Sequence, residues 1–260
     1  MAVRRCPDWD SFRPDPGLTD GPVAFGADLG PDGVLSAYRH GIIPFPAPDE
    51  YHRTLNEVRY GDQVDAGVIG LIGPDGDGSD PYEVAWWCPD PRPVIAAGRV
   101  HLGRNVRKRL RREPGWTTTA DTAFERVAEQ CRAGREPRWL TDPLLESLAA
   151  LHEKGWAHSV EVWQDDELVG GAFGVAVGPV LSGDSIFARR PEAARVAVAD
   201  LAARFAAAGG QLIDAQWDSP FLRSLGANPM PRDLFRKKMR GPADRTELSH
   251  ERQPARRLLP

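Results

Sequence analysis

Two polar side chains in the C-terminal part of the chain, Asp214 and Gln216, could take part in chemistry together. They lie two residues apart in a run, residues 211–217, that is predicted to form a strand, so both should point to the same side of a sheet. Such a pair can position a reacting group, but it can equally be a buried hydrogen-bonded pair that only stabilises the fold. The residues alone leave both interpretations open.

A strongly basic helix is the second candidate for a functional element. Residues 99–112 contain seven Lys or Arg and no Asp or Glu, while Leu102, Val106 and Leu110 recur at helical spacing. This charge suggests a partner rich in phosphates, such as tRNA, although charge runs on helices are often only solvated faces. The phosphate-binding candidates are Arg104, Arg107, Lys108 and Arg111, and a second cluster, Arg236, Lys237, Lys238 and Arg240, could extend their surface.

The composition limits the class of protein. With a formal net charge of -4, the chain has no overall attraction to nucleic acid, so any affinity for RNA must come from a local patch. No apolar run is long enough for a membrane span or an export signal, which predicts a soluble cytoplasmic protein. Cys6, Cys88 and Cys131 form no Cys-x-x-Cys pair and the histidines show no ligand spacing, so free buried thiols and no metal site are expected.

The composition and periodicity of the sequence change near residue 98, which predicts a domain boundary there. Residues 1–98 are predicted to form a small N-terminal α+β domain, with one clear helix over residues 31–39. Residues 49–83 are interpreted as a Gly/Asp-rich insertion that contains one strand-like run, residues 68–72, and a flexible loop. The tail, residues 241–260, has no periodicity and is predicted to be flexible.

Residues 99–240 are predicted to form the larger, catalytic domain. After the basic helix, the periodicities indicate helices around 124–131 and 144–151, strands over 158–163, 168–177 and 180–187, a helix from residue 191 and the strand 211–217. Three antiparallel strands, a helix and a returning strand are the layout of the α+β (α/β) acyltransferase fold typified by N-acetyltransferases. That fold usually binds coenzyme A through a Gly-rich loop before the helix, but residues 187–194 contain no glycine, which disfavours a coenzyme A donor.

Several motifs, taken together and in order, resemble the leucyl/phenylalanyl-tRNA protein transferase family. They are GADL at 26–29, LSAYRHGIIP at 35–44, WWCPDPR at 86–92, HSVEVW at 158–163, LVGG at 168–171, GDSIF at 183–187 and LIDAQ at 212–216. The resemblance implies an N-terminal domain followed by an acyltransferase-fold domain. It also implies transfer of Leu or Phe from aminoacyl-tRNA to the N-terminal Arg or Lys of a protein, which marks that protein for degradation. Because the aminoacyl ester is already activated, no cofactor or metal is expected.

The resemblance also assigns residue roles. It implies that the Gln216 oxygen accepts a hydrogen bond from the attacking amine, and that Asp214 orients and polarises the Gln216 amide. Asp184 stands where the family has Glu and is expected to contact the amine or ester of the donor, from a side chain shorter by roughly 1.5 Å. Trp87 and Trp139 match tryptophans near the terminal adenosine of tRNA. The implied aminoacyl pocket consists of Ala172, Leu181, Gly183, Ile186, Leu201, Phe205 and Ile213.

Three alternative functions stay open at this point. The altered pocket, Asp184 and the insertion allow a transferase that uses the same donor with a different peptide or small-molecule amine. A coenzyme A-dependent N-acetyltransferase is disfavoured by the missing glycines, and an RNA-binding module without turnover is disfavoured by Asp214 and Gln216. Nothing in the sequence demands more than a monomer.

Overall fold

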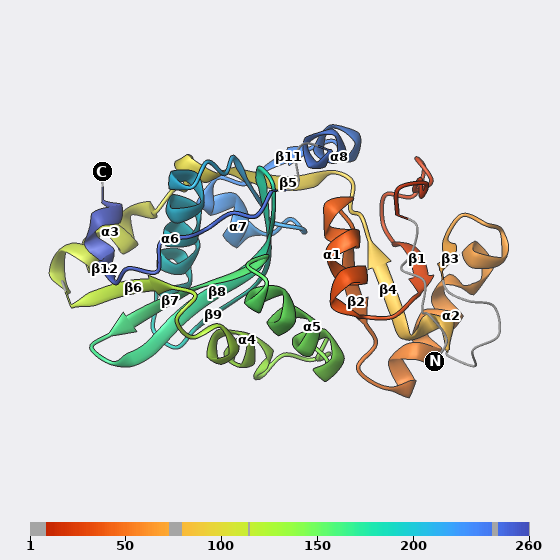
Figure 1. Cartoon of the computed structure of the whole chain (residues 1–260), viewed down its shortest axis with the longest axis horizontal. Coiled ribbons are helices and arrows are strands. Elements are labelled where there is room, and N and C mark those ends of the chain that lie inside the picture. The colour runs from red at the N-terminus through yellow and green to blue at the C-terminus, as the bar shows by residue number, and fades with distance from the viewer. Residues whose placement is uncertain (1–8, 73–79, 114, 241–243, 260) are drawn as a thin grey trace.

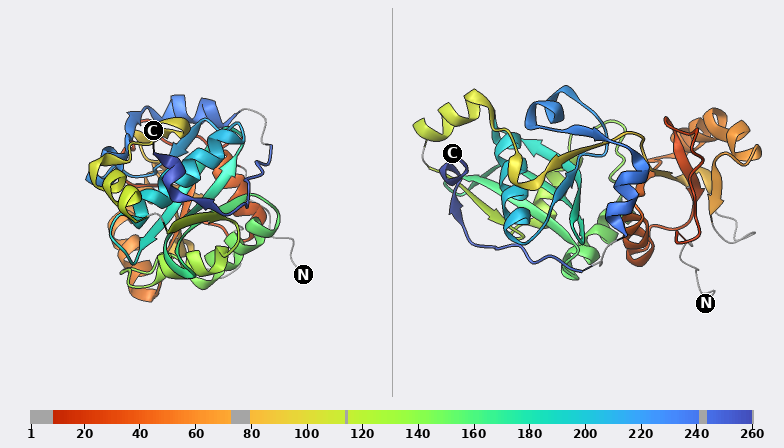
Figure 2. Two further views of the ribbon diagram at one scale, coloured as in Figure 1. Left: turned by 90° about the vertical axis from the view of Figure 1, so that its left-hand side faces the viewer. Right: turned by 90° about the horizontal axis from the view of Figure 1, so that it is seen from above.

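The computed structural model describes residues 9–72, 80–113, 115–240 and 244–259, which form two β-sheets lying side by side along the long axis of the molecule (Figures 1 and 2). The smaller sheet has the order β2 (Ile43–Pro46), β4 (Val84–Trp87), β1 (Pro22–Gly26), β3 (Gly70–Ile72). Strand β1 is parallel to β3, and β4 is antiparallel to both β1 and β2.

Helix α1 (Pro31–Arg39) lies between the two sheets, and its ends are those predicted from the sequence. Pro31 sets the backbone of its first turn, where a missing N–H costs nothing. The helix ends before Gly41, whose φ of 72° is left-handed. A Cβ on Gly41 would lie 2.8 Å from the Phe235 ring, so a glycine here also lets the end of α1 pack against the C-terminal half of the chain.

The sequence interpretation of residues 49–83, one strand-like run and a flexible loop, missed a helix. Helix α2 (Glu50–Asp65) fills the first half of this segment, and the Asp49 carboxylate caps it by accepting a hydrogen bond from the backbone N–H of His52 (2.9 Å). Only Tyr60 of this helix is buried, so the apolar stripe that identifies a helix in a sequence is missing. The predicted strand is present as β3, and the loop expected after it falls on residues 73–79, outside the described residues.

The larger sheet runs in the order β11, β5, β10, β9, β8, β7, β6, β12. Its strands are β5 (Arg92–Ala96), β6 (Trp116–Ala120), β7 (Ala157–Gln164), β8 (Glu167–Val177), β9 (Val180–Ala188), β10 (Leu212–Asp214), β11 (Asn228–Met230) and β12 (Gln253–Pro254). Strands β7 to β9 form the predicted antiparallel meander, and β10 runs parallel to β9. Because β5 belongs to this sheet, the chain passes from one sheet to the other after β4, earlier than residue 98.

Helices cover both faces of the larger sheet. Helix α6 packs on one face of β7, β8 and β9, and α4 and α5 pack on the opposite face (Figure 1). The helices of this part are α3 (Gly103–Arg112), α4 (Phe124–Arg132), α5 (Asp142–Glu153), α6 (Ala193–Ala207), α7 (Pro220–Leu225) and α8 (Arg232–Met239). The basic helix begins at Gly103, not at residue 99. The α+β class and the meander, helix and parallel strand expected of an acyltransferase fold are confirmed.

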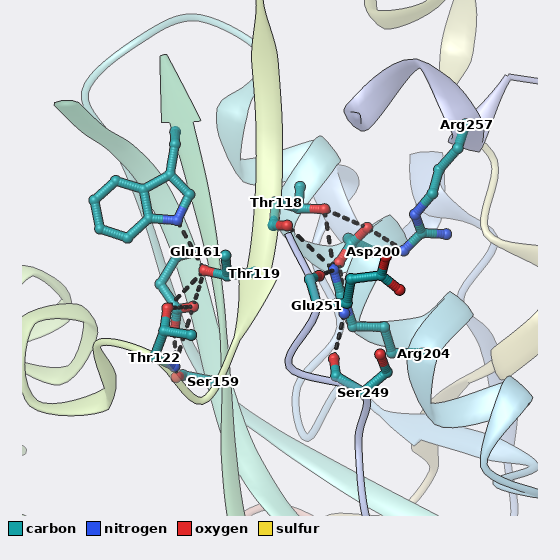
Figure 3. A network of polar contacts seen from close by, with 11 residues as sticks. Thr118, Thr119, Thr122, Ser159, Glu161, Asp200, Arg204, Ser249, Glu251 and Arg257 are labelled. Atoms are coloured by element: carbon teal, nitrogen blue, oxygen red, sulfur yellow. Dashed lines mark hydrogen bonds and ion pairs between the residues drawn. The ribbon is translucent and has the colours of Figure 1, made fainter. Parts of the chain in front are cut away.

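The C-terminal segment is packed on this domain, so the prediction of a flexible tail was wrong for residues 244–259. Strand β12 pairs with β6, and Leu248 and Ala255 are buried. The fully buried Asp200 carboxylate on α6 accepts hydrogen bonds from Arg204 (2.6 Å) and from Arg257 of the tail (2.5 Å), as Figure 3 shows. The ion pair between Arg257 and Asp200, hydrogen bonds from Arg204 to the carbonyls of Ser249 and Glu251, and apolar side chains packed on the core hold this segment. Such long-range contacts leave no periodic pattern in a sequence.

A buried carboxylate without a cationic partner in the described residues joins β6 to β7 in the same region (Figure 3). Glu161 accepts hydrogen bonds from the hydroxyl groups of Thr119 (2.5 Å), Thr122 (2.8 Å) and Ser159 (2.6 Å). Hydroxyl donors on β6, on β7 and in the bend after β6 therefore satisfy this carboxylate.

Candidate active site

The candidate reaction centre lies where two parallel strands separate. Strand β10 pairs with β9 from Leu212 opposite Val180 to Asp214 opposite Ser182, and the pairing ends there. Asp184 lies two residues further along β9, at an irregularity where Phe173 pairs with Ser185 but Gly174 pairs with Gly183. Asp184 is thus the extra residue of a bulge, and bulges re-aim side chains at functional sites. Side chains, not backbone hydrogen bonds, connect the two strands beyond this point.

The Asp214 carboxylate is fully buried and held from three sides. The Arg92 guanidinium donates to both of its oxygens (2.7 and 2.8 Å), the Ser182 hydroxyl donates to Oδ2 (2.8 Å), and the backbone N–H of Gln216 donates to Oδ1 (2.9 Å). Arg92 is itself buried, with its guanidinium 4.7 Å from the centre of the Phe235 ring. A bidentate pair of this kind fixes both partners in one orientation.

Gln216 is positioned differently from the prediction. Strand β10 ends at Asp214, and Gln216 follows in a left-handed backbone conformation with a φ of 60°. Its side-chain NH₂ group donates to Asp184 Oδ1 (2.6 Å) and to the Ser182 hydroxyl (3.2 Å), while Asp214 binds its backbone N–H. Asp214 therefore contacts Gln216 directly only through the main chain and reaches its side-chain amide through the Ser182 hydroxyl. Both amide hydrogens are engaged, which leaves the side-chain oxygen as the acceptor for a substrate.

Asp184 is held by the N-terminal part of the chain as well. The Tyr38 hydroxyl on α1 donates to Asp184 Oδ1 (2.8 Å), whereas the buried Oδ2 has no hydrogen-bond partner among the described residues. Burial raises the pKa of Asp184 to about 7, and the hydrogen bonds from Tyr38 and Gln216 oppose this rise. Burial, followed by the charge of Asp184, raises the pKa of Tyr38 well above its ordinary value, so Tyr38 stays a donor.

Four aromatic side chains from both parts of the molecule gather beside Gln216. Phe45 stacks on Trp139 with ring centres 4.9 Å apart and an interplanar angle of 12°. Trp217 makes edge contacts with Phe45 (5.2 Å) and Trp87 (6.0 Å), and all four side chains are half-buried. The structure thus brings Trp87 and Trp139 into one cluster, and it adds Phe45 and Trp217.

The residues of the expected aminoacyl pocket lie together between the larger sheet and α6. Ala172, Leu181, Leu201, Phe205 and Ile213 are buried in this core, and the half-buried Ile186 packs against it. Gly183 lies beside β10, where a Cβ would come within 3.3 Å of the Asp214 carbonyl oxygen. Core packing alone would also produce these contacts, so the pocket stays a prediction.

The two predicted basic clusters occupy separate places. On α3, Arg104, Lys108 and Arg111 are exposed and Arg107 is half-buried, opposite the buried Val106 and Leu110. Helix α3 lies at the end of the larger domain, whereas α8 lies at the junction of the two sheets (Figures 1 and 2). The cluster on α8 therefore does not continue the α3 surface.

Two histidines, His152 and His158, are each held through one ring nitrogen by a group of the protein. His158 Nδ1 lies 2.8 Å from the Asp121 carboxylate, and His152 Nδ1 lies 2.9 Å from the Ala157 carbonyl. Among the described residues, no three His, Cys, Asp or Glu side chains converge as a metal site requires. Cys88 and Cys131 are buried free thiols, and Cys6 lies outside the described residues. No helix in the described ranges is both long and apolar enough to cross a membrane.

Comparison with known proteins places the chain in a family. The model of the leucyl/phenylalanyl-tRNA protein transferase family matches residues 94–240. The chain belongs to this family. The match contains Asp184, Asp214 and Gln216, whereas the two residues that hold them from outside, Tyr38 and Arg92, precede it.

Full-length relatives extend the similarity into the N-terminal domain. The leucyl/phenylalanyl-tRNA protein transferase of Chromohalobacter salexigens is 41% identical over 219 residues, which cover 83% of this chain and 73% of the relative. Those of Xanthomonas axonopodis pv. citri (37% identity, 83% and 75% covered) and Teredinibacter turnerae (36%, 90% and 78%) are similar. A GCN5-related N-acetyltransferase from Kribbella flavida covers 55% of each chain at 14% identity and a TM-score of 0.36. The fold assignment rests on the topology described above and not on this last likeness.

Proposed function

We propose that the protein moves leucine, phenylalanine or a similar apolar aminoacyl group from aminoacyl-tRNA onto the N-terminal Arg or Lys of an acceptor protein, which marks the acceptor for degradation. The observation that carries this proposal is the buried network in which Arg92 and Asp214 fix Gln216 beside Asp184, in a chain of this transferase family. We place the reaction in the cytoplasm, where charged tRNA is available, and assign a monomer.

The reaction needs orientation more than activation. The acceptor amine attacks the ester carbonyl, a C–N bond forms, and the C–O bond to the terminal ribose breaks. The Gln216 oxygen accepts a hydrogen bond from the amine, because Asp184 and Ser182 occupy its NH₂ group. The Arg92–Asp214 pair keeps Gln216 in its strained backbone conformation through the Gln216 N–H.

One proton must leave the amine and one must reach the ribose oxygen. A neutral amide such as Gln216 is too weak a base to carry this proton. Asp184 has a pKa of about 7 and one buried oxygen without a partner in the described residues, so it can accept and release a proton near neutral pH. The resemblance to the family also implies that the Asp184 carboxylate contacts the amine or ester of the donor.

The donor is held by side chains around this centre. Trp87 and Trp139, together with Phe45 and Trp217, offer ring faces for the terminal adenine, and such stacking is worth about 1 to 3 kcal/mol per base. The α3 cluster, Arg104, Arg107, Lys108 and Arg111, contacts acceptor-stem phosphates without reading sequence. The aminoacyl side chain enters the apolar region around Ile186, Leu201 and Phe205, where burial contributes about 1.5 to 3 kcal/mol.

Incubation with a pool of charged, labelled tRNAs and paired peptides tests the proposal. The peptides should differ only in an N-terminal Arg or Ala, with acetyl-CoA as a control donor. We expect label from leucyl- or phenylalanyl-tRNA on the Arg peptide. Label on other amines would replace the assigned acceptor, and tRNA binding without any transfer would contradict an enzymatic function.

A further inference from the structure

A concave basic pocket lies between α1, α8 and the N-terminal segment, and it shares no residue with the reaction centre. It has a volume of about 320 Å³ and is lined by Asp10, Arg13, Arg39, His40, Arg236, Met239 and Arg240. Four arginines therefore face one small space, and the only carboxylate of the lining, Asp10, is 3.0 Å from His40 Nε2.

Main-chain carbonyls, not carboxylates, anchor two of these arginines. Arg13 donates to the carbonyls of Asp10 (2.6 Å) and Phe12 (2.8 Å), and Arg236 donates to those of His40 and Phe12 (3.3 Å each). Carbonyl groups fix the direction of a guanidinium without neutralising its charge. The pocket therefore holds its positive groups in place and leaves their charge free to act on a ligand.

The other two arginines form no ion pair among the described residues. The Arg39 guanidinium lies 5.0 Å from the centre of the Trp156 ring, and its Nε is buried without a hydrogen-bond partner. Arg240 is exposed at the end of α8. Favourable interaction with a helix dipole explains single basic residues at helix C-termini, but it does not require several of them to face one another.

The crowding of these charges is unfavourable. Burial, and then the charges of Arg13, Arg240 and Arg232, lower the pKa of Arg236. Like charges gathered in a concave site repel one another, and a bound anion relieves the repulsion. The structure thus contains the electrostatic arrangement of an anion site and, among the described residues, too little negative charge to fill it.

We propose that this pocket binds a phosphate group, supplied either by the tRNA backbone or by a free phosphate-bearing molecule. Guanidinium groups match phosphate oxygens in geometry and form strong charge-assisted hydrogen bonds with them. Only the binding of a tRNA phosphate, and not that of a free phosphate-bearing molecule, rests on the proposed function. The structure also divides the basic cluster of α8, because Arg236 and Arg240 line the pocket whereas Lys237 and Lys238 do not.

The pocket is lined by residues of the two helices that also contact the network of the reaction centre. Tyr38, which donates to Asp184, immediately precedes Arg39 on α1. Phe235, which packs on Arg92, immediately precedes Arg236 on α8. A phosphate held here would therefore bind the two helices that support Asp184 through Tyr38 and Arg92 through Phe235.

Calorimetry with inorganic phosphate, against chloride at equal ionic strength, tests binding. The pocket variant is Arg39→Gln with Arg240→Gln, and the matched control is Lys237→Gln with Lys238→Gln, which removes equal charge from the same region outside the pocket. Thermal melts establish that both variants fold. We expect one phosphate to bind the wild type and the control, with affinity reduced about tenfold or more in the pocket variant.

Binding of uncharged tRNA at several salt concentrations shows whether the phosphate in the pocket belongs to tRNA or to a free ligand. If a backbone phosphate occupies the pocket, the slope of log K against log salt should be smaller by about 0.9 to 1.8 in the pocket variant than in the control, one or two phosphate contacts. Equal slopes with phosphate bound in calorimetry indicate a free phosphate-bearing ligand. Equal slopes without pocket-dependent phosphate binding, or selective binding of an acidic peptide, overturn the proposal. Aminoacyl transfer by the wild type, measured in parallel, judges the proposed function separately.

Discussion

The pH dependence of transfer should report the ionisation of Asp184. With a pKa of about 7, its carboxylate should be about one-tenth ionised at pH 6 and about nine-tenths ionised at pH 8. If the ionised form drives the reaction, the ionisation of Asp184 alone should raise kcat/KM for aminoacyl-tRNA about tenfold over this interval. The acceptor α-amine loses its proton near pH 8, and only the deprotonated amine attacks. This adds a further rise in rate, so the wild-type profile should contain two ionisations.

Replacing Tyr38 separates these two ionisations. Tyr38→Phe removes a hydrogen bond that lowers the pKa of Asp184, so the inflection due to Asp184 should move to higher pH while that of the amine stays in place. The rate should therefore fall at pH 7 and recover at higher pH. Single-turnover transfer at saturating acceptor, measured from pH 5.5 to 9, follows both. A rate lowered equally at every pH, with no displaced inflection, would refute the role assigned to Asp184 and Tyr38.

Three further outcomes follow from the contacts described above. Arg92→Met should lower the free energy of unfolding in urea by about 3 to 5 kcal/mol, because it leaves Asp214 buried without its cation; an unchanged midpoint would count against that ion pair. Trp217→Ala should raise KM for aminoacyl-tRNA about tenfold with little change in kcat, and an unaltered KM would remove it from the donor site. Arg257→Ala should lower stability by about 1 to 2 kcal/mol and increase proteolysis of the C-terminal segment, whereas unchanged cleavage would show that Asp200 does not anchor it.

Local patterns in the sequence were sufficient to predict strands β7 to β10 of the larger sheet, but not β5, β6, β11 and β12. The meander has long apolar strands, so its period was visible. The helix after it, Ala193–Ala207, lies between Pro191 and Gly209, which mark its ends to within two residues. Helix α2 and the C-terminal segment were not predictable in this way. The first buries only Tyr60, and the second is held by contacts such as Arg257 with Asp200, which no local period reveals.

The same distinction applies to the candidate site. Asp184, Asp214 and Gln216 lie in motifs that resemble those of the transferase family, so the resemblance identifies these three residues. Their partners could not be found by spacing, because Arg92 is 122 residues from Asp214 and Tyr38 is 146 residues from Asp184. Both lie in the motifs that carried the resemblance, and that is the signal by which they could have been selected.

The Arg92–Asp214 pair also changes which variant is informative. Asp214→Ala would leave the Arg92 guanidinium buried without its carboxylate, so a loss of activity in this variant would also follow from misfolding. Gln216→Leu removes the acceptor oxygen and leaves this ion pair intact.

The most direct test of the transferase assignment is therefore mass spectrometry of an Arg-initiated peptide after a single turnover with phenylalanyl- or leucyl-tRNA. We expect the wild type and Lys237→Gln to add one Phe or Leu residue to the peptide N-terminus, and folded Gln216→Leu to lose this product. A wild type that leaves the peptide unmodified, or a Gln216→Leu variant that modifies it at the wild-type rate, would contradict the central claim.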